Sequence, residues 1–217
     1  MASPCATIER IVLGPIANNV YAISDEASMV LVDPSCEAQR ILAFLDGRVP
    51  DAIFVTHAHY DHIGALAEIR RATGAPVFVS ADEEPLVSGK RPVWGGHNAI
   101  EPCPVDHVVH DDELLSVGTM TWRAMITPGH SRGSTCFLID AAHAQGAQES
   151  TMPILVSGDT LFEGNIGRTD FDGGDFQAMR RSLARLATLQ NDTLVLPGHG
   201  NPTTIAAERM RVFRRYC

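Results

Sequence analysis

The chain has 217 residues, enough for one sizeable hydrophobic core, and we expect a single domain over residues 1–217. Its formal net charge of −9 argues against a general nucleic-acid binder, because such a protein needs a basic face to displace counterions from phosphates. No apolar run is long enough to span a membrane, residues 1–10 do not resemble a secretory signal, and the five cysteines form no C-x-x-C pair. These features predict a cytoplasmic protein without a disulfide framework or a cysteine zinc site.

The N-terminal part of the chain predicts short strands separated by turns and helices. Strand-like runs rich in β-branched and apolar residues occur at residues 8–13, 20–24, 29–32, 53–55 and 77–79. Asn18 and Asn19 suit a turn between the first two strands. Apolar positions within residues 41–45 have helical spacing, and a second helix is expected to begin near Ile63 and to end at Gly74 as its C-cap.

Residues 81–112 interrupt this pattern with several prolines and glycines, which predicts a long loop. Four side chains in this loop form either a lid over a site or an ordinary solvated surface: Lys90, Arg91, Trp94 and His97. Long loops in compact domains are often functional, so both interpretations stay open.

Strands alternate with helices in the rest of the chain. Strand-like runs occur at residues 120–126, 135–139, 154–156 and 193–196. Residues 141–151 predict an exposed connection, Asp175 is expected to cap the helix that follows it, and the last helix is expected to begin near Thr203 or Thr204. This order of elements predicts an α/β domain in which mixed sheets are covered by helices.

Four candidate metal ligands directly follow the expected strand at residues 53–55: His57, His59, Asp61 and His62, within T-H-A-H-Y-D-H-I-G. Imidazole nitrogen and carboxylate oxygen suit zinc, iron or manganese without a thiolate. His57 and His59 lie two residues apart in extended chain and can point the same way, whereas Asp61 and His62 follow the bend toward a helix and can face a second metal. A single histidine at a strand end is usually structural, and Asp61 alone would suit a helix N-cap, but the cluster favours a metal site.

Three later segments of similar design place another candidate ligand just after a strand. They are T-P-G-H-S with His130, S-G-D-T with Asp159 and P-G-H-G with His199. Each has a glycine beside the candidate ligand, and glycine permits unusual backbone angles and close approach. One such segment would suit an ordinary turn, but three of them predict that their side chains complete the same site.

Together these motifs resemble those of the metallo-β-lactamase-fold hydrolase superfamily, and the resemblance runs from V-L-V-D-P at residues 30–34 through His199. It implies an α/β fold, a four-layer αβ/βα sandwich of two mixed β-sheets flanked by helices, with two divalent metal ions at one edge of the sheets. One metal would be held by His57, His59 and His130, a second by Asp61, His62 and His199, and Asp159 would bridge them.

The mechanism that this resemblance implies is two-metal hydrolysis, in which a metal-activated water attacks a carbonyl carbon. Zinc is the first choice of metal, with iron and manganese as alternatives. Asp61 and Asp159 are the candidate catalytic residues, and Asp61 would accept or steer the proton. Asp33 is either a residue that orients a ligand histidine or a turn residue before Pro34, and both interpretations stay open.

The stretch G-D-T-L-F-E-G-N-I-G-R-T-D-F at residues 158–171 resembles the short, single-domain glyoxalase II-like branch, the hydroxyacylglutathione hydrolases. This resemblance implies a small-molecule thioester substrate derived from glutathione. Arg168 fills the position at which a basic residue of glyoxalase II contacts glutathione, so we expect it to bind a substrate carboxylate, with a salt bridge to Asp170 as the alternative. Gly200 and Asn201 stand where a tyrosine-bearing segment is expected, and the C-terminal helical domain is not present after His199, so another thioester or ester is an alternative substrate.

A second function considered is an iron-dependent persulfide dioxygenase of the same superfamily, in which G-R-T-D-F also occurs. Its single iron would match His57, His130 and Asp159. The segment L-P-G-H-G at residues 196–200 is the hydrolase form and favours hydrolysis. A lactonase or other ester hydrolase of this fold is a third alternative, and a β-lactamase is less favoured because no export signal is seen.

Overall fold

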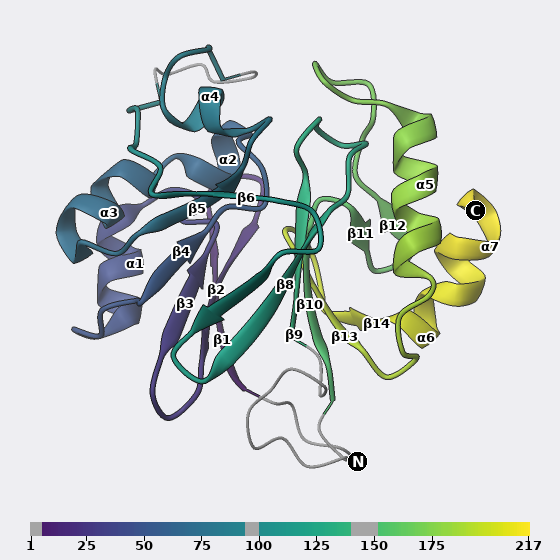
Figure 1. The fold of residues 1–217 in the computed structure, drawn as a ribbon, viewed down its shortest axis with the longest axis horizontal. Coiled ribbons are helices and arrows are strands. Elements are labelled where there is room, and N and C mark those ends of the chain that lie inside the picture. Colours follow the sequence, from purple (N-terminus) through teal and green to yellow (C-terminus); the bar gives the residue numbers. More distant parts are fainter. Residues whose placement is uncertain (1–5, 94–99, 140–151) are drawn as a thin grey trace.

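Two six-stranded mixed β-sheets face each other in the computed structural model, which describes residues 6–93, 100–139 and 152–217 (Figure 1). The first sheet contains, in spatial order, β1 (Thr7–Leu13), β2 (Asn18–Ser24), β3 (Met29–Val32), β4 (Ala52–Phe54), β5 (Val77–Ser80) and β6 (His107–Val109). The second contains β14 (Thr203–Thr204), β13 (Leu194–Pro197), β10 (Ile154–Gly158), β9 (Thr135–Ile139), β8 (Met120–Ile126) and β7 (Leu114–Val117). A small hairpin pairs β11 (Leu161–Phe162) with β12 (Asn165–Ile166).

Helices cover the outer face of each sheet, on opposite flanks of the molecule in Figure 1. The helices near the first sheet are α1 (Ala38–Leu45), α2 (Tyr60–Ile63), α3 (Leu66–Thr73) and α4 (Glu84–Val87). Those near the second are α5 (Phe176–Leu186), α6 (Ile205–Glu208), the π-helix η1 (Arg209–Phe213) and α7 (Arg214–Tyr216). The expected α/β sandwich of two mixed sheets flanked by helices is confirmed.

Apolar side chains fill three layers, one between the sheets and one between each sheet and its helices. In the central layer, Phe54 of β4 lies with its ring centroid 4.5 Å from that of Phe137 and 5.3 Å from that of Trp122. All three side chains are fully buried, so they hold the first sheet firmly against the second.

Strand direction in the second sheet brings three strand ends to one edge. β8 is antiparallel to β9, β9 is antiparallel to β10, and β10 is parallel to β13. Because β8, β10 and β13 therefore run in the same direction, the segments that follow them emerge at the same edge of the sheet. These are the segments that carry His130, Asp159 and His199.

Within residues 81–112, expected to be a long loop, the described parts include the helix α4 and the strand β6, which pairs with β5. Several of the described prolines and glycines of this stretch lie outside these short elements, where the chain turns. Lys90 forms an ion pair with Glu84 at 2.7 Å. Trp94 and His97, and the expected connection at residues 141–151, lie outside the described residues.

The second expected helix is divided into α2 and α3, with Gly64 and Ala65 between them. The amide of Ala65 donates to the carbonyl oxygen of Ser35 at 3.1 Å, and a Cβ on Gly64 would lie 2.4 Å from the same oxygen. The loop after β3 thus interrupts the helix, a tertiary contact that periodicity does not reveal. The expected C-cap is confirmed, because Gly74 has a left-handed φ of 73° and donates its N–H to Arg70.

Two other helix starts agree with the sequence. The Asp175 side chain accepts hydrogen bonds from the amides of Gln177 and Ala178, and that of Thr204 accepts one from Ala207. Unlike the expected single helix, the chain after Thr204 continues from α6 into a π-helix.

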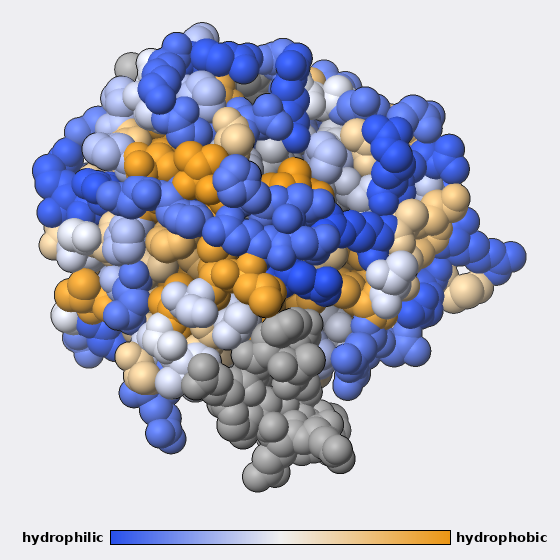
Figure 2. Space-filling model, viewed as in Figure 1, coloured by the Kyte–Doolittle hydropathy of each residue, from blue (hydrophilic) through white to orange (hydrophobic). Residues whose placement is uncertain are grey.

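Polar side chains cover most of the face shown in Figure 2, and the apolar ones lie in separate patches. None of the helices in the described ranges has the length and apolar composition that a membrane span requires.

Candidate metal centre

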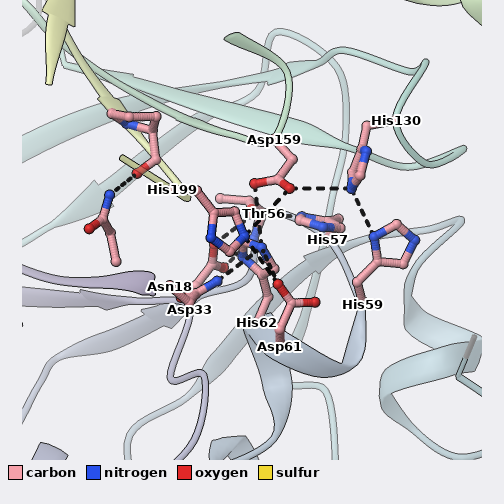
Figure 3. Close-up of polar contacts among 12 residues, drawn as sticks. Asn18, Asp33, Thr56, His57, His59, Asp61, His62, His130, Asp159 and His199 are labelled. Atoms are coloured by element: carbon pink, nitrogen blue, oxygen red, sulfur yellow. Dashed lines mark hydrogen bonds and ion pairs between the residues drawn. The ribbon is translucent and has the colours of Figure 1, made fainter. Parts of the chain in front are cut away.

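All seven residues expected to form the site lie together where the two sheets meet (Figure 3). His57 and His59 follow β4, Asp61 and His62 belong to α2, and the other three follow β8, β10 and β13. Three groups have their potential ligand atoms within 4.8 Å of one another: His57, His59 and His130; His57, His62 and Asp159; and Asp61, His62 and His199.

The first group is a buried trio of imidazoles. The Nδ1 atom of His59 lies 2.8 Å from the Nε2 atom of His130, and the ring of His57 lies edge-on to both, at centroid distances of 4.7 and 4.8 Å. Three ring nitrogens directed at one small volume are the donor set of a three-histidine metal site.

The group of Asp61, His62 and His199, called the second group from here on, combines two imidazoles with a carboxylate. The Oδ2 atom of Asp61 lies 3.1 Å from Nε2 of His199 and 3.4 Å from Nε2 of His62. A mixed nitrogen and oxygen donor set of this kind also suits a divalent transition metal.

Asp159 lies between the two groups and approaches members of both. Its Oδ1 atom is 3.4 Å from Nε2 of His62, and its Oδ2 atom is 3.5 Å from Nε2 of His130 and 3.7 Å from Nε2 of His199. A carboxylate whose two oxygens lie near the ring nitrogens of both groups can hold two metals at once. The arrangement is therefore that of a binuclear metal site.

Hydrogen bonds outside the cluster orient the histidine rings. Nδ1 of His130 faces the carbonyl oxygen of Arg168 at 2.7 Å, and Nδ1 of His199 faces that of Ile16 at 3.1 Å. Because a carbonyl oxygen only accepts, Nδ1 must carry the proton in both rings, and in the neutral ring this leaves the lone pair of Nε2 directed into the cluster. Nδ1 of His57 is held in turn by the hydroxyl of Thr56 at 3.0 Å.

Asp33 performs both of the roles that its sequence context allowed. Its φ of 49° is left-handed, as in a tight turn. Its carboxylate accepts the amide of Thr56 at 2.8 Å and the Thr56 hydroxyl at 2.7 Å, and it lies 2.8 Å from Nδ1 of His62. One buried carboxylate thus orients His62 and fixes the residue that precedes His57.

The protonation states that the fold favours are mostly those of metal ligands. Burial lowers the pKa of His57 well below its ordinary value and, with His130 and His62 nearby, lowers that of His59 to about 4. Burial alone would raise the pKa of Asp61, but His62 and His199 hold it below its ordinary value. At neutral pH these imidazoles are neutral and this carboxylate is ionised, as metal binding requires.

His62 is the exception. Burial alone would lower its pKa, but the carboxylates of Asp159, Asp33 and Asp61 raise it well above the ordinary value. Binding of a metal at Nε2 would therefore displace a proton from this ring.

Two buried atoms at the centre of the cluster indicate that a cation belongs there. Among the described residues, His57 Nε2 and Asp159 Oδ1 are buried without a hydrogen-bond partner, even though Asp159 Oδ1 is 3.4 Å from His62 Nε2. Each unsatisfied buried polar group costs about 1–3 kcal/mol, and metal coordination would satisfy both. The residues present therefore fit a divalent metal pair.

Comparison with known proteins agrees with this geometry. The sequence matches the family described as the metallo-beta-lactamase superfamily over residues 13–144 and 149–199. The chain belongs to the metallo-β-lactamase superfamily. The probable metallo-hydrolase YqgX of Bacillus subtilis (strain 168) is 35% identical over 206 residues, which cover 92% of this chain and 93% of that protein.

Another relative is the hydroxyacylglutathione hydrolase GloC of Haemophilus influenzae, 27% identical over 85% of this chain and 86% of its own. Among solved structures, BLEG-1 B3 metallo-β-lactamase has a TM-score of 0.81 at 34% identity and covers 95% of this chain and 99% of its own. TTHA1623 in a di-iron-bound form has a TM-score of 0.76 at 33% identity, covering 94% and 98%. These likenesses support both the superfamily and a binuclear centre.

A glycine in the last motif of this superfamily protein has a clear steric role. A Cβ on Gly198 would lie 2.4 Å from Oδ1 of Asp159 and 2.7 Å from Cε1 of His62. Only glycine therefore allows β13 to deliver His199 this close to the other candidate ligands.

Asn18 and Asn19 were expected in a turn, but they begin β2 and are buried beside the site. The Asn18 amide nitrogen lies 3.0 Å from Nε2 of His62, and the Asn19 amide donates to the carbonyl of Pro197 at 2.8 Å and of Gly200 at 3.0 Å. Turn propensity alone cannot distinguish an exposed asparagine from one that binds a distant loop. The sequence feature that could have indicated their burial is the position of two adjacent asparagines directly before an apolar strand.

The guanidinium of Arg168 pairs with Asp170, with Nε–Oδ1 at 2.9 Å and Nη2–Oδ2 at 2.7 Å, and lies 4.2 Å from the ring centre of Phe171. The alternative salt bridge is therefore present, although both charged groups are exposed. The expected contact with substrate stays a prediction.

We expect Asp33→Asn to weaken metal binding about 10–100-fold, because partners of ligand histidines typically contribute this much. The asparagine side chain cannot supply two acceptor oxygens to Thr56 and His62 together. Metal affinity in a chelator competition assay checks this. Asp51→Asn is the matched control, since Asp51 also accepts a backbone amide, that of Met29 at 2.8 Å, but lies outside the cluster. Equal affinities for both variants would contradict the orienting role.

The low pKa of His59 makes the metal-free protein sensitive to acid. The unfolded chain binds a proton at this side chain below about pH 6.5, whereas the folded chain does so only near pH 4. This stability contribution is thus fully present above about pH 6.5 and is lost as the pH falls toward 4. Denaturant unfolding in chelator should show a smaller loss over this window for His59→Gln than for the wild type. His110→Gln, at an exposed position, should retain the wild-type slope.

Proposed function

We propose that this protein is a binuclear metal-dependent hydrolase that cleaves a thioester of the hydroxyacylglutathione type. The observation that carries the proposal is the position of Asp159, between two groups of candidate ligands in which every expected residue is present. The likeness to a hydroxyacylglutathione hydrolase of Haemophilus influenzae supports the choice of substrate.

In this proposal His57, His59 and His130 would hold one metal, Asp61, His62 and His199 would hold the other, and Asp159 would be shared. Zinc is the first choice, and the di-iron-bound form of TTHA1623 supports iron as the alternative. Such a metal pair supplies a nucleophile at neutral pH and polarises the substrate carbonyl.

The protein's own groups position the reaction. Asp33, Thr56 and the carbonyl of Arg168 fix the ring orientations, which keeps the donor atoms preorganised. Asp61 is ionised and partly exposed, so it is placed to accept or steer a proton at the mouth of the cluster. A thiolate leaves with little need for protonation, so a thioester suits a cluster whose titratable side chains are all proposed ligands.

In this proposal the leaving thiol lies at a pocket beside His59. Its lining includes two cations, Arg91 and Arg132, and three carboxylates, Asp82, Glu83 and Asp172, next to Leu86 and Pro92. A lining of mixed charge suits a thiol that carries both carboxylates and an ammonium group, as glutathione does.

The first experiment is hydrolysis of S-lactoylglutathione by the purified protein, with metal content measured on the same sample. We expect turnover with about two bound metals. Asp159→Ala should reduce kcat/KM by roughly 1,000-fold, equivalent to about 4 kcal/mol of transition-state stabilisation. Asp192→Ala, at an exposed carboxylate, is the control and should keep wild-type activity.

Two other outcomes would reassign the chemistry. A single bound iron with oxygen uptake on glutathione persulfide would favour the dioxygenase alternative. Hydrolysis of a β-lactam or a lactone in place of the thioester would favour the activity named for BLEG-1, or a lactonase.

Arg168→Met tests the proposed substrate contact. We expect KM for S-lactoylglutathione to rise roughly tenfold or more with kcat little changed, because hydrogen bonds to charged groups contribute about 1.5–3 kcal/mol. Arg71→Met is the matched control, since Arg71 is also exposed and pairs with Glu101 at 2.6 Å. An unchanged KM for Arg168→Met would assign Arg168 to the Asp170 salt bridge alone.

A further inference from the structure

Glu83 is a fully buried carboxylate that the proposed chemistry leaves unused. It lies in the turn after β5, directly before α4, and is 1% exposed. Although it occupies the N-cap position of that helix, its side chain makes no capping hydrogen bond. Its carboxylate is directed instead toward two loops that carry candidate metal ligands.

Three donors from two separate loops converge on this carboxylate. Oε2 accepts the amide of Ala58 at 2.9 Å, and Oε1 accepts the hydroxyl of Ser131 at 2.7 Å and the amide of Gly133 at 2.9 Å. Ala58 is the residue between His57 and His59, and Ser131 directly follows His130. One side chain thus connects the two loops that supply the three-histidine group.

The end of β5 holds the second loop by a further contact. The Ser80 hydroxyl donates to the carbonyl of Gly133 at 2.7 Å, so both polar groups of Gly133 are bound from this turn. A Cβ on Gly133 would lie 2.4 Å from Oγ of Ser80 and 2.8 Å from Cγ of Glu83. The close approach of the two sheets at this point requires a glycine.

The second group of candidate ligands is held by other residues. Asp33 contacts His62, and the carbonyl of Ile16 contacts His199. Among the described contacts of Glu83, none reaches Asp61, His62 or His199.

We propose that Glu83 is a positioning residue that sets the separation of the two histidine loops and thereby controls metal affinity at the His57–His59–His130 group alone. This inference rests on the metal centre proposed above. Ligand constellations must be held within about 0.5 Å of their productive geometry, so the loss of one tie between two loops is sufficient to weaken binding.

Glutamine is the informative replacement because it keeps the size and removes one acceptor. Its Oε1 can still serve one loop, but its amide nitrogen would face an N–H or O–H donor of the other. Glu208→Gln is the matched control. Glu208 is also fully buried and also joins two segments, accepting the Thr203 hydroxyl at 2.6 Å and the Gly164 amide at 2.9 Å.

The test is titration of the chelator-treated full-length protein with Zn²⁺ against a competing indicator, repeated with Co²⁺ to follow its absorption bands. Wild type should bind two ions. Glu83→Gln should bind one of them about 10–100-fold more weakly and the other unchanged. Glu208→Gln should bind both as wild type does, although its metal-free form unfolds at lower denaturant concentration, as Glu83→Gln also should.

A double-mutant comparison assigns the weakened site. If Glu83 acts through the His57–His59–His130 group, adding Glu83→Gln to His59→Ala should cause no further loss of metal affinity. Equal weakening of both ions, wild-type affinities in Glu83→Gln, or the same metal loss in Glu208→Gln would each overturn the positioning role. A wild-type protein that binds no metal would overturn the proposed function itself.

Discussion

The structure depends on bringing five imidazoles and two carboxylates, most of them buried, into one small volume. Burial of polar groups is unfavourable unless each finds a partner, and the cluster alone leaves His57 Nε2 and Asp159 Oδ1 without one. The surrounding fold provides outward partners for the rings, from Asp33, Thr56 and two backbone carbonyls. Those contacts leave the inward nitrogen atoms directed at the space that two cations would fill.

Much of this site was predictable because each candidate ligand lies in a short motif that can be recognised locally in the sequence. A histidine or aspartate beside a glycine at a strand end can be recognised from the sequence alone. Because β8, β10 and β13 share a direction, the three motifs of this kind meet at one edge of the sheet. The sandwich itself followed from the resemblance and from the order of strands and helices. Strand and helix periodicity also located most of the longer elements, within a few residues of the ends that the structure has.

The parts that were missed depend on contacts between residues far apart in the chain. The interruption at Gly64 comes from the carbonyl of Ser35, and the burial of Asn18 comes from its position against His62. Glu83 has no sequence signature, since an acidic residue in a turn is usually exposed. Its role follows only from the approach of Gly133, a residue of the opposite sheet's connection, to the end of β5.

Each group of candidate ligands draws from both halves of the sandwich. His57, His59, Asp61 and His62 follow the first sheet, whereas His130, Asp159 and His199 follow the second. A metal in either group would therefore join the two sheets, and its binding free energy would add to the stability of their packing. The converse holds as well. The packed rings of Phe54, Phe137 and Trp122 between the sheets, and the carboxylate of Glu83 at their edge, keep the two sets of ligands at a fixed separation before any metal binds. The separation of the two sheets therefore determines both how well their side chains pack and how tightly the site binds metal.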